Sequence, residues 1–287
     1  MQISERESGR SPVRKGLSFL VEQMDRFGGE PSLTLRRESV SFRRLPQEFE
    51  GYRLVQVSDL HSRLFGENQD QLLQAICELR PDGIFLTGDL LHRNYDREEK
   101  KRLRPFLENV VRLAPVYAVE GNHESRSPSG WELMLDMKAA GITVLMDRGI
   151  CLYREGARIG IAGLSARPNS ELRRKKEPDI TVLERGRRAL KLFSPGDFVI
   201  LLAHCPEDFE AYQQLGASLV LSGHAHGGLM RLPGGRALLA PGQGWLPRYT
   251  RGLYAGLGTV MEVSAGLGGP RIGIPPELVC LELHRKA

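Results

Sequence analysis

The feature of this 287-residue chain that most constrains its fold is a repeated unit, in which a short apolar run ends in acidic, histidine or asparagine residues. The runs are continuous and rich in β-branched residues, which is typical of strands buried on both faces. Helix-like stretches at 69–80 and 98–112 separate the early runs, and strands that alternate with helices predict an α/β fold. The five units are 53–57 before Ser58-Asp59, 84–86 before Thr87-Gly88-Asp89, 116–119 before Gly121-Asn122-His123, 199–203 before His204, and 219–221 before Ser222-Gly223-His224.

The polar residues that follow these runs are groups that divalent cations use as ligands. Ligands of α/β sheets gather beyond the carboxyl ends of the strands, where short loops can bring such side chains together. Carboxylate, imidazole and amide groups suit hard and borderline ions, and two neighbouring ions need a shared carboxylate. The sequence supplies seven candidate ligands, namely Asp59, His61, Asp89, Asn122, His204, His224 and His226.

Each of these motifs alone has an ordinary structural interpretation. A D-x-H sequence is more often a turn, Gly-Asp after a strand is common, and a lone histidine at a strand end is usually satisfied by its neighbours. Their joint occurrence, each after an apolar run, favours a metal centre. Five of the seven histidines fall in these segments, and only His92 and His284 lie outside them.

The same motifs resemble those of a known enzyme family. DLH at 59–61, TGDL at 87–90, GNHE at 121–124, the lone His204 and SGHAHGG at 222–228 are similar to the motif series of calcineurin-like metallophosphoesterases. The similarity runs from about Gly51 to the C-terminus, and the segments 249–254 and 264–268 resemble a bacterial subgroup in which many members carry an N-terminal membrane anchor. The resemblance implies a central β-sandwich of two sheets flanked by helices.

The resemblance also implies a role for each candidate residue. The first metal ion would be held by Asp59, His61 and His226, the second by Asn122, His204 and His224, and both by Asp89. His123 would donate a proton or stabilise the phosphate. The cofactors would be two divalent ions, with manganese expected and iron, zinc, cobalt or nickel as alternatives. Leu229 departs from the subgroup, which often has glutamine there.

The expected activity is hydrolysis of a phosphodiester or pyrophosphate bond by a metal-bound hydroxide. Related enzymes suggest a lipid-linked nucleotide such as UDP-diacylglucosamine as substrate. The alternative is a phosphomonoesterase acting on protein or small molecules. A nuclease or nucleic-acid-binding protein is a weaker alternative, because no aromatic-basic repeat accompanies the net charge of +5. The complete ligand set argues against a non-catalytic scaffold.

Composition and the N-terminal segment bear on organisation and location. The four cysteines form no C-x-x-C pair, which favours free thiols in a reducing compartment. No run approaches the roughly 18 apolar residues of a membrane span, so a cytoplasmic location is expected. Residues 1–30 are interpreted as a tail and an amphipathic helix, which either binds the inner face of the membrane or packs on the metallophosphoesterase domain at 31–287. The oligomeric state stays open.

Two further segments are candidates for contact with the substrate. Arg248, Tyr249 and Arg251, with Trp245, follow the GHAH segment closely enough to line the substrate mouth, although they could instead close the edge of the sheet. The charged stretch 165–195, with a basic run at 173–176, is expected to form a surface loop and a helix over the site. Cys205 follows a candidate ligand and is expected to be buried packing, not a nucleophile.

Overall fold

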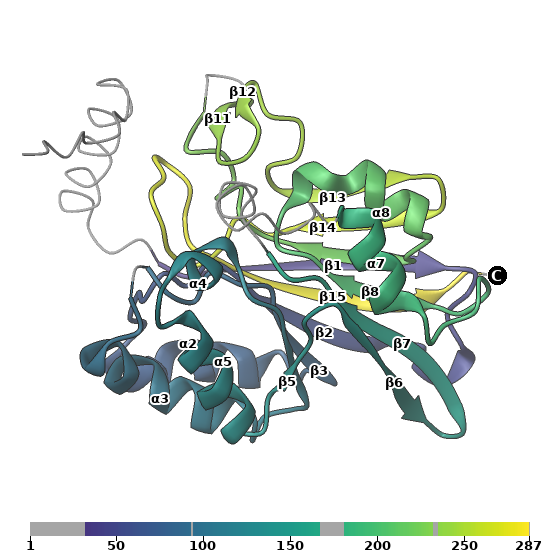
Figure 1. Cartoon of the computed structure of the whole chain (residues 1–287), viewed down its shortest axis with the longest axis horizontal. Helices are drawn as coiled ribbons and strands as arrows, with labels where there is room; N and C mark the ends of the chain where they lie inside the picture. Colours follow the sequence, from purple (N-terminus) through teal and green to yellow (C-terminus); the bar gives the residue numbers. More distant parts are fainter. Residues whose placement is uncertain (1–31, 93, 167–180, 232–234, 287) are drawn as a thin grey trace, which may run out of the picture.

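The computed structural model of the chain describes residues 32–92, 94–166, 181–231 and 235–286 (Figure 1). The expected N-terminal helix and the basic run at 173–176 lie outside the described residues. The helices are α2 (Asp70–Glu78), α3 (Arg97–Val110), α4 (Asn122–Arg126), α5 (Gly130–Ala139), α7 (Val182–Leu190) and α8 (Phe209–Leu215), with the 3-10 turns η1 (Gln47–Phe49), η2 (Glu67–Gln69) and η3 (Pro206–Asp208).

The first large sheet has six strands, in the order β1-β15-β2-β3-β4-β5. Strands β2 to β5 run parallel, β15 is antiparallel to β2, and β1 is parallel to β15. The last strand of the chain is therefore inserted between the first two. Their bounds are β1 (Thr34–Phe42), β15 (Glu277–Arg285), β2 (Tyr52–Val57), β3 (Gly83–Leu86), β4 (Val116–Ala118) and β5 (Thr143–Val144).

The second large sheet also has six strands, in the order β13-β14-β9-β8-β7-β6. Its four central strands are parallel, and an antiparallel strand closes each edge. Their bounds are β13 (Gly252–Gly256), β14 (Thr259–Val263), β9 (Leu219–Ser222), β8 (Val199–Leu202), β7 (Ala157–Gly163) and β6 (Arg148–Arg154). A small third sheet joins β10 (Met230–Arg231), β11 (Ala237–Ala240) and β12 (Gly244–Trp245).

The two large sheets pack face to face, with helices on both outer faces (Figure 1). Successive side chains of a strand point to opposite faces, so each buried strand supplies two cores. In β3, Ile84 packs under the helices α2, α3 and α5, whereas Phe85 packs between the sheets. In β8, Ile200 joins the core between the sheets, whereas Leu201 faces α7 and α8. The expected α/β sandwich is therefore confirmed.

The helix α7 lies in the outer layer of the second sheet, where it packs against α8, β6 and β7. The sequence placed this charged helix over the site, and that part of the prediction is wrong for α7. The reason is its apolar face: Val182, Ala189 and Leu190 join the core beneath the sheet and hold the helix there.

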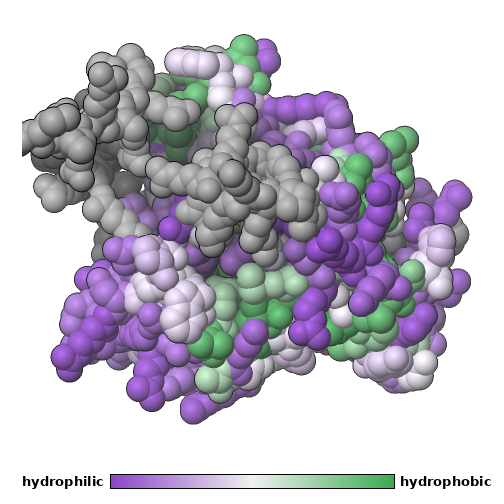
Figure 2. Space-filling view, in the orientation of Figure 1, coloured by the Kyte–Doolittle hydropathy of each residue, from purple (hydrophilic) through white to green (hydrophobic). Residues whose placement is uncertain are grey.

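The face seen in Figure 2 is largely hydrophilic, with hydrophobic side chains gathered in smaller patches. Within the described residues, no helix is both long enough and apolar enough to cross a membrane.

Candidate metal centre

The candidate ligands lie in five loops that come from both large sheets. Asp59 and His61 follow β2, Asp89 follows β3, and Asn122 and His123 begin α4 after β4. His204 follows β8, and the pair His224 and His226 follows β9. Because parallel strands end at the same edge of a sheet, both sheets deliver their polar residues to one region.

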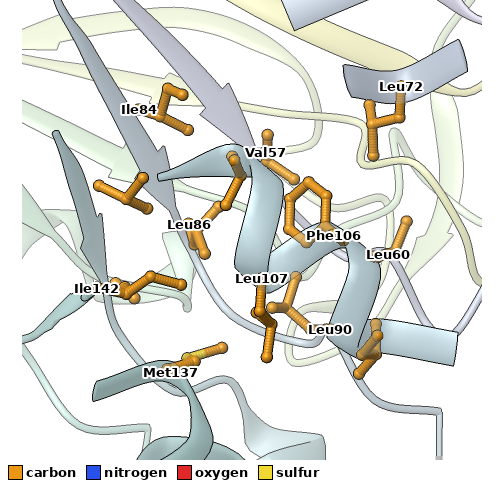
Figure 3. Close-up of a cluster of buried hydrophobic side chains, with 14 of the residues drawn as sticks. Val57, Leu60, Leu72, Ile84, Leu86, Leu90, Phe106, Leu107, Met137 and Ile142 are labelled. Carbon is orange, nitrogen blue, oxygen red and sulfur yellow. The ribbon is translucent and has the colours of Figure 1, made fainter. Parts of the chain in front are cut away.

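Apolar neighbours anchor these loops in the core. Leu60 and Leu90 follow the two aspartates, and both are buried in the cluster under α2 and α3 (Figure 3). Burying a leucine side chain contributes roughly 1.5–3 kcal/mol, so each anchor resists movement of the loop that carries the carboxylate.

The backbone of the loops is held in an unusual conformation. Asp59 (φ 50°), His61 (φ 48°), Asp89 (φ 53°), His224 (φ 64°) and His226 (φ 51°) all have positive φ. Such residues cost about 1–3 kcal/mol each and persist where surrounding structure holds them. Here the Asp59 amide donates to the Gly88 carbonyl and the His61 amide donates to the Asp89 carbonyl, each at 3.0 Å.

One group of candidate ligands consists of Asp59, His61 and His226, whose donor atoms all lie within 4.8 Å of one another. The Nε2 atoms of both histidines lie 3.8 Å from Asp59 Oδ1. All three residues are buried. The Asp59 carboxylate is held from behind, since Ser58 Oγ donates to its Oδ2 at 2.5 Å and the His224 amide donates to it at 3.1 Å.

The second group consists of Asp89, His204 and His224, again with donor atoms within 4.8 Å of one another. His204 Nε2 lies 3.1 Å from Asp89 Oδ2 and 3.2 Å from Asn122 Oδ1, which brings the asparagine into the same group. His204 Nδ1 lies 2.7 Å from the Thr87 carbonyl oxygen. A carbonyl only accepts, so Nδ1 carries a proton and Nε2 faces the ligand position.

The donor sets fit divalent cations. Three buried nitrogen atoms have no hydrogen-bond partner among the described residues: both ring nitrogens of His61, and Nδ1 of His226. A buried polar atom left unsatisfied costs about 1–3 kcal/mol, and ligation would remove that cost at a ligand atom. The carboxylate and amide oxygens suit manganese and the imidazoles suit iron and zinc, so the mixed donor sets are compatible with each of these ions.

The protonation of the histidines differs between positions. Burial lowers the pKa of His224 to about 3 and that of His226 to about 4, and it holds the pKa of His61 well below its ordinary value. Burial also acts to lower the pKa of His204, but the Asp89 carboxylate more than offsets it and raises the pKa to about 10. Three of the imidazoles are therefore neutral and ready to bind metal near pH 7.

His123 stands at the solvent side of the two groups. Its side chain is 33% exposed, whereas that of His61 is 2% exposed. Its Nδ1 lies 2.6 Å from the His92 carbonyl oxygen, so Nδ1 is protonated and Nε2 is the free nitrogen. That Nε2 lies 4.0 Å from Asp89 Oδ2 and thus points toward the centre.

Glu124 is a supporting residue to which the sequence analysis assigned no role. Its carboxylate is buried and accepts hydrogen bonds from the amides of Asp89, Leu91 and Gly121, at 2.7–2.8 Å. It thereby ties the Asp89 loop to the start of α4. The sequence signal that could have indicated this role is the position of Glu124, because a glutamate three residues after a helix N-cap is typical of a capping box.

Arg126 is a second residue without an assigned role. It is exposed at the end of α4, and its positive charge contributes to the lowered pKa of His224, after the larger effects of burial and of His204. An exposed cation near the second group suits an anionic substrate. A basic residue two positions after the GNHE motif is the sequence signal that could have indicated it.

The three candidate substrate contacts make other interactions in the structure. Tyr249 is buried in the core of the second sheet against Phe209 and Tyr254. Arg251 is paired with the buried Glu277, and the exposed Arg248 lies over the Tyr249 ring. These contacts match the alternative interpretation, that the segment closes the sheet edge, and contact with substrate stays a prediction.

All four cysteines are free, and Cys205 is half-buried, so its expected packing role stays a prediction. Burial raises the pKa of the Cys205 thiol well above its ordinary value. A thiol that stays protonated at neutral pH is a poor nucleophile.

Two adjacent groups of candidate ligands at the strand ends are typical of a dinuclear metallohydrolase, and a comparison with family models identifies the family. The family model described as calcineurin-like phosphoesterase matches residues 52–228. The chain belongs to this family. It is a metal-dependent phosphoester hydrolase of the kind that uses divalent ions in a dinuclear centre.

Individual proteins are also similar to the chain, at 17–27% sequence identity. The uncharacterized metallophosphoesterase YkuE of Bacillus subtilis is 27% identical over 231 residues, which cover 79% of this chain and 76% of the relative. Phosphodiesterase YaeI of Escherichia coli is 26% identical over 242 residues, 81% of this chain and 82% of the relative. A solved NAD nucleotidase from Haemophilus influenzae aligns with a TM-score of 0.46 at 17% identity, over 75% of this chain and 45% of that chain.

Proposed function

We propose that the chain hydrolyses phosphodiester or pyrophosphate bonds with two divalent cations bound at the two ligand groups. The observation that carries the proposal is the position of Asp89. Its Oδ2 lies 3.9 Å from His61 Nε2 in the first group and 3.1 Å from His204 Nε2 in the second. A carboxylate that reaches both groups is what a bridged pair of ions requires.

This arrangement supports an assignment of each ligand to one of the two ions. Asp59, His61 and His226 would hold one ion, Asn122, His204 and His224 the other, and Asp89 both. When bound, two such ions acidify a water molecule and neutralise charge on the phosphoryl group. Manganese is the expected ion, with iron, zinc, cobalt and nickel as alternatives that the same donors accept.

The residues of the chain contribute position and proton transfer. The Asp89 carboxylate is fixed because its Oδ1 accepts the His123 amide at 2.8 Å. The same peptide therefore positions both the bridge and the His123 ring. To donate a proton to the leaving group, His123 must be doubly protonated, since its neutral form carries the proton on Nδ1. A positioned acid of this kind contributes about 10²–10⁴-fold to the rate.

A diester substrate is supported by the phosphodiesterase among the relatives. The test compares bis-p-nitrophenyl phosphate with p-nitrophenyl phosphate on manganese-loaded protein. The proposal expects the higher kcat/KM for the diester and loss of both activities on chelation. A higher kcat/KM for the monoester would make the chain a phosphomonoesterase. Unchanged activity in protein shown to be metal-free would exclude the metal mechanism.

A lipid-linked substrate such as UDP-diacylglucosamine, at the inner face of a membrane, is a second candidate. The observation that favours it is an exposed amphipathic tip on the small sheet. Trp245 is 71% exposed, Leu246 is 58% exposed, and the side chain of Arg248 is 74% exposed. An aromatic ring, an aliphatic side chain and a cation together suit the interface of an anionic bilayer.

Binding to vesicles tests this tip. The double variant Trp245→Ala/Leu246→Ala should sediment less with vesicles containing phosphatidylglycerol, while it hydrolyses a soluble diester at the normal rate. Leu257→Ala is the matched control, since Leu257 is 84% exposed in the turn between β13 and β14. Equal sedimentation of the double variant and the parent chain would show that the tip does not bind the membrane.

A further inference from the structure

A third group of imidazoles lies beside the dinuclear centre. Of its three members, only His61 is a proposed ligand of that centre. One nitrogen from each of His61, His92 and His123 lies within 4.8 Å of the others. The ring centroids of His61 and His123 are 4.6 Å apart, and the His92 ring lies 6.0 Å from His61 and 6.1 Å from His123. His92 was one of the two histidines outside the ligand motifs.

The group runs from the interior to the solvent. His61 is buried, the His123 side chain is 33% exposed, and His92 is exposed. An ion can therefore reach the group without passing the dinuclear centre.

The orientation of His123 decides what an ion here would do. Because Nδ1 of His123 donates to the His92 carbonyl, its Nε2 is the nitrogen open to a ligand. This is the same atom that the proposed function uses for proton transfer. An ion on Nε2 takes up the lone pair and leaves no proton to donate.

The donor set also selects the kind of ion. All three side chains are imidazoles, which suit zinc, copper, nickel and cobalt, whereas manganese and magnesium prefer oxygen ligands. Once His61 gives its Nε2 to the first ion of the centre, the third position depends on His92 and His123 with water. Its affinity should therefore be lower than that of the two catalytic positions.

We propose that His92 and His123, beside His61, form a third metal position that binds zinc and similar ions and inhibits the enzyme by occupying His123. The inhibitory part rests on the proposed function of His123, whereas the binding part rests on the geometry of the three rings. The enzyme would then work with manganese and be switched off by an excess of zinc.

The experiment uses the full chain loaded with manganese and dialysed against increasing zinc. Bound zinc and manganese are counted by elemental analysis, and hydrolysis of bis-p-nitrophenyl phosphate is measured on the same samples. The variant is His92→Ala, which keeps the backbone carbonyl that holds His123. The control is His284→Ala, because His284 lies on β15 and pairs with Glu50 at 2.7 Å.

The parent chain and His284→Ala should bind one more zinc ion than His92→Ala and lose activity as that ion binds. His92→Ala should keep its manganese activity and need at least about tenfold more zinc for inhibition, since ligand removal costs no less than the 10–100-fold typical of supporting residues. Zinc that merely displaces manganese would inhibit all three proteins alike, and that result would overturn the proposal.

Two further outcomes separate this proposal from the proposed function. If His92→Ala loses the extra zinc ion but the parent chain stays active with it bound, the position exists and the inhibition through His123 is wrong. If manganese supports no hydrolysis in any of the proteins, the proposed function fails, and zinc counting still decides whether the third position exists.

Discussion

Two buried histidines at the candidate metal centre differ in charge, although each belongs to a ligand group. Burial lowers the pKa of His226 to about 4, whereas the neighbouring Asp89 carboxylate raises the pKa of His204 to about 10 in spite of burial. Ligation requires a free Nε2 lone pair on His204. An ion entering the second group must therefore displace a proton, while an ion entering the first group meets neutral imidazoles.

This difference predicts that the two ions bind with different pH dependence. The pKa of His204 is raised, so its proton is present below about pH 10 and is released on binding. Affinity at the second group should rise about tenfold per pH unit between pH 6 and 9, and affinity at the first group should stay flat. Calorimetry in buffers of different ionisation enthalpy counts the released protons. Two binding events without proton release would contradict the predicted state of His204.

His123→Ala tests the proton donor. Both ions should remain bound, because His123 is not an expected ligand. Turnover should fall by about 10²-fold or more, and the loss should shrink for aryl esters with good leaving groups, which need little protonation. The measurement is metal content together with the rates for esters of rising leaving-group pKa. An equal loss for all esters would show that His123 stabilises the phosphoryl oxygens, and loss of metal would make it a ligand.

At the scale of elements, the centre depends on loops that approach each other without intervening side chains. A Cβ on Gly121 would lie 2.1 Å from Asp89 Oδ1, and one on Gly223 would lie 2.2 Å from Asp59 Oδ2. Both distances are impossible for real atoms, so the glycines in GNHE and SGHAH are required by the carboxylates they touch. The motifs therefore carry steric information as well as ligands.

Gly121→Ala isolates this steric requirement. The backbone at Gly121 (φ −95°, ψ −176°) is extended and accepts alanine, so the effect comes only from the contact with Asp89. We expect weaker metal binding and a loss of about 10²-fold in activity from displacement of the bridge. Gly196→Ala is the control, because a Cβ there meets no atom within 4 Å. Normal metal content and activity in Gly121→Ala would show that the loop can shift to accommodate the added Cβ without displacing Asp89.

The elements that the sequence predicted best are those with a local pattern. The expected helix at 98–112 is α3 (Arg97–Val110), and the run 199–203 contains β8 (Val199–Leu202). The expected strand at 278–283 is the core of β15. The hairpin of β6 and β7 and the helix α5 were not predicted, because their patterns are weaker. β6, for example, is exposed or half-buried along its whole length.

At the scale of the whole molecule, the placement of the sheets could not be read from the sequence. Strand β15 lies between β1 and β2, although more than 200 residues separate it from both. A buried ion-pair network joins these parts: Arg36 on β1, whose side chain is 14% exposed, is bound to the fully buried Glu262 on β14 and Glu277 on β15. Such pairings depend on tertiary contacts and leave no local pattern in the sequence, whereas the ligand motifs are local. The sequence therefore predicts the candidate metal ligands but not the buried charges that join the strands.

The two sheets each supply part of the ligand set, and Asp89 lies between the two groups. The most direct measurement is therefore manganese stoichiometry in chelator-treated protein, titrated while hydrolysis of bis-p-nitrophenyl phosphate is followed. The parent chain and the exposed control Asp70→Asn should bind two ions per chain, with activity rising as the second ion binds. Asp89→Asn should bind at most one ion and be inactive, because the charge between the cations is removed. Two bound ions and normal hydrolysis in Asp89→Asn would contradict the bridged centre.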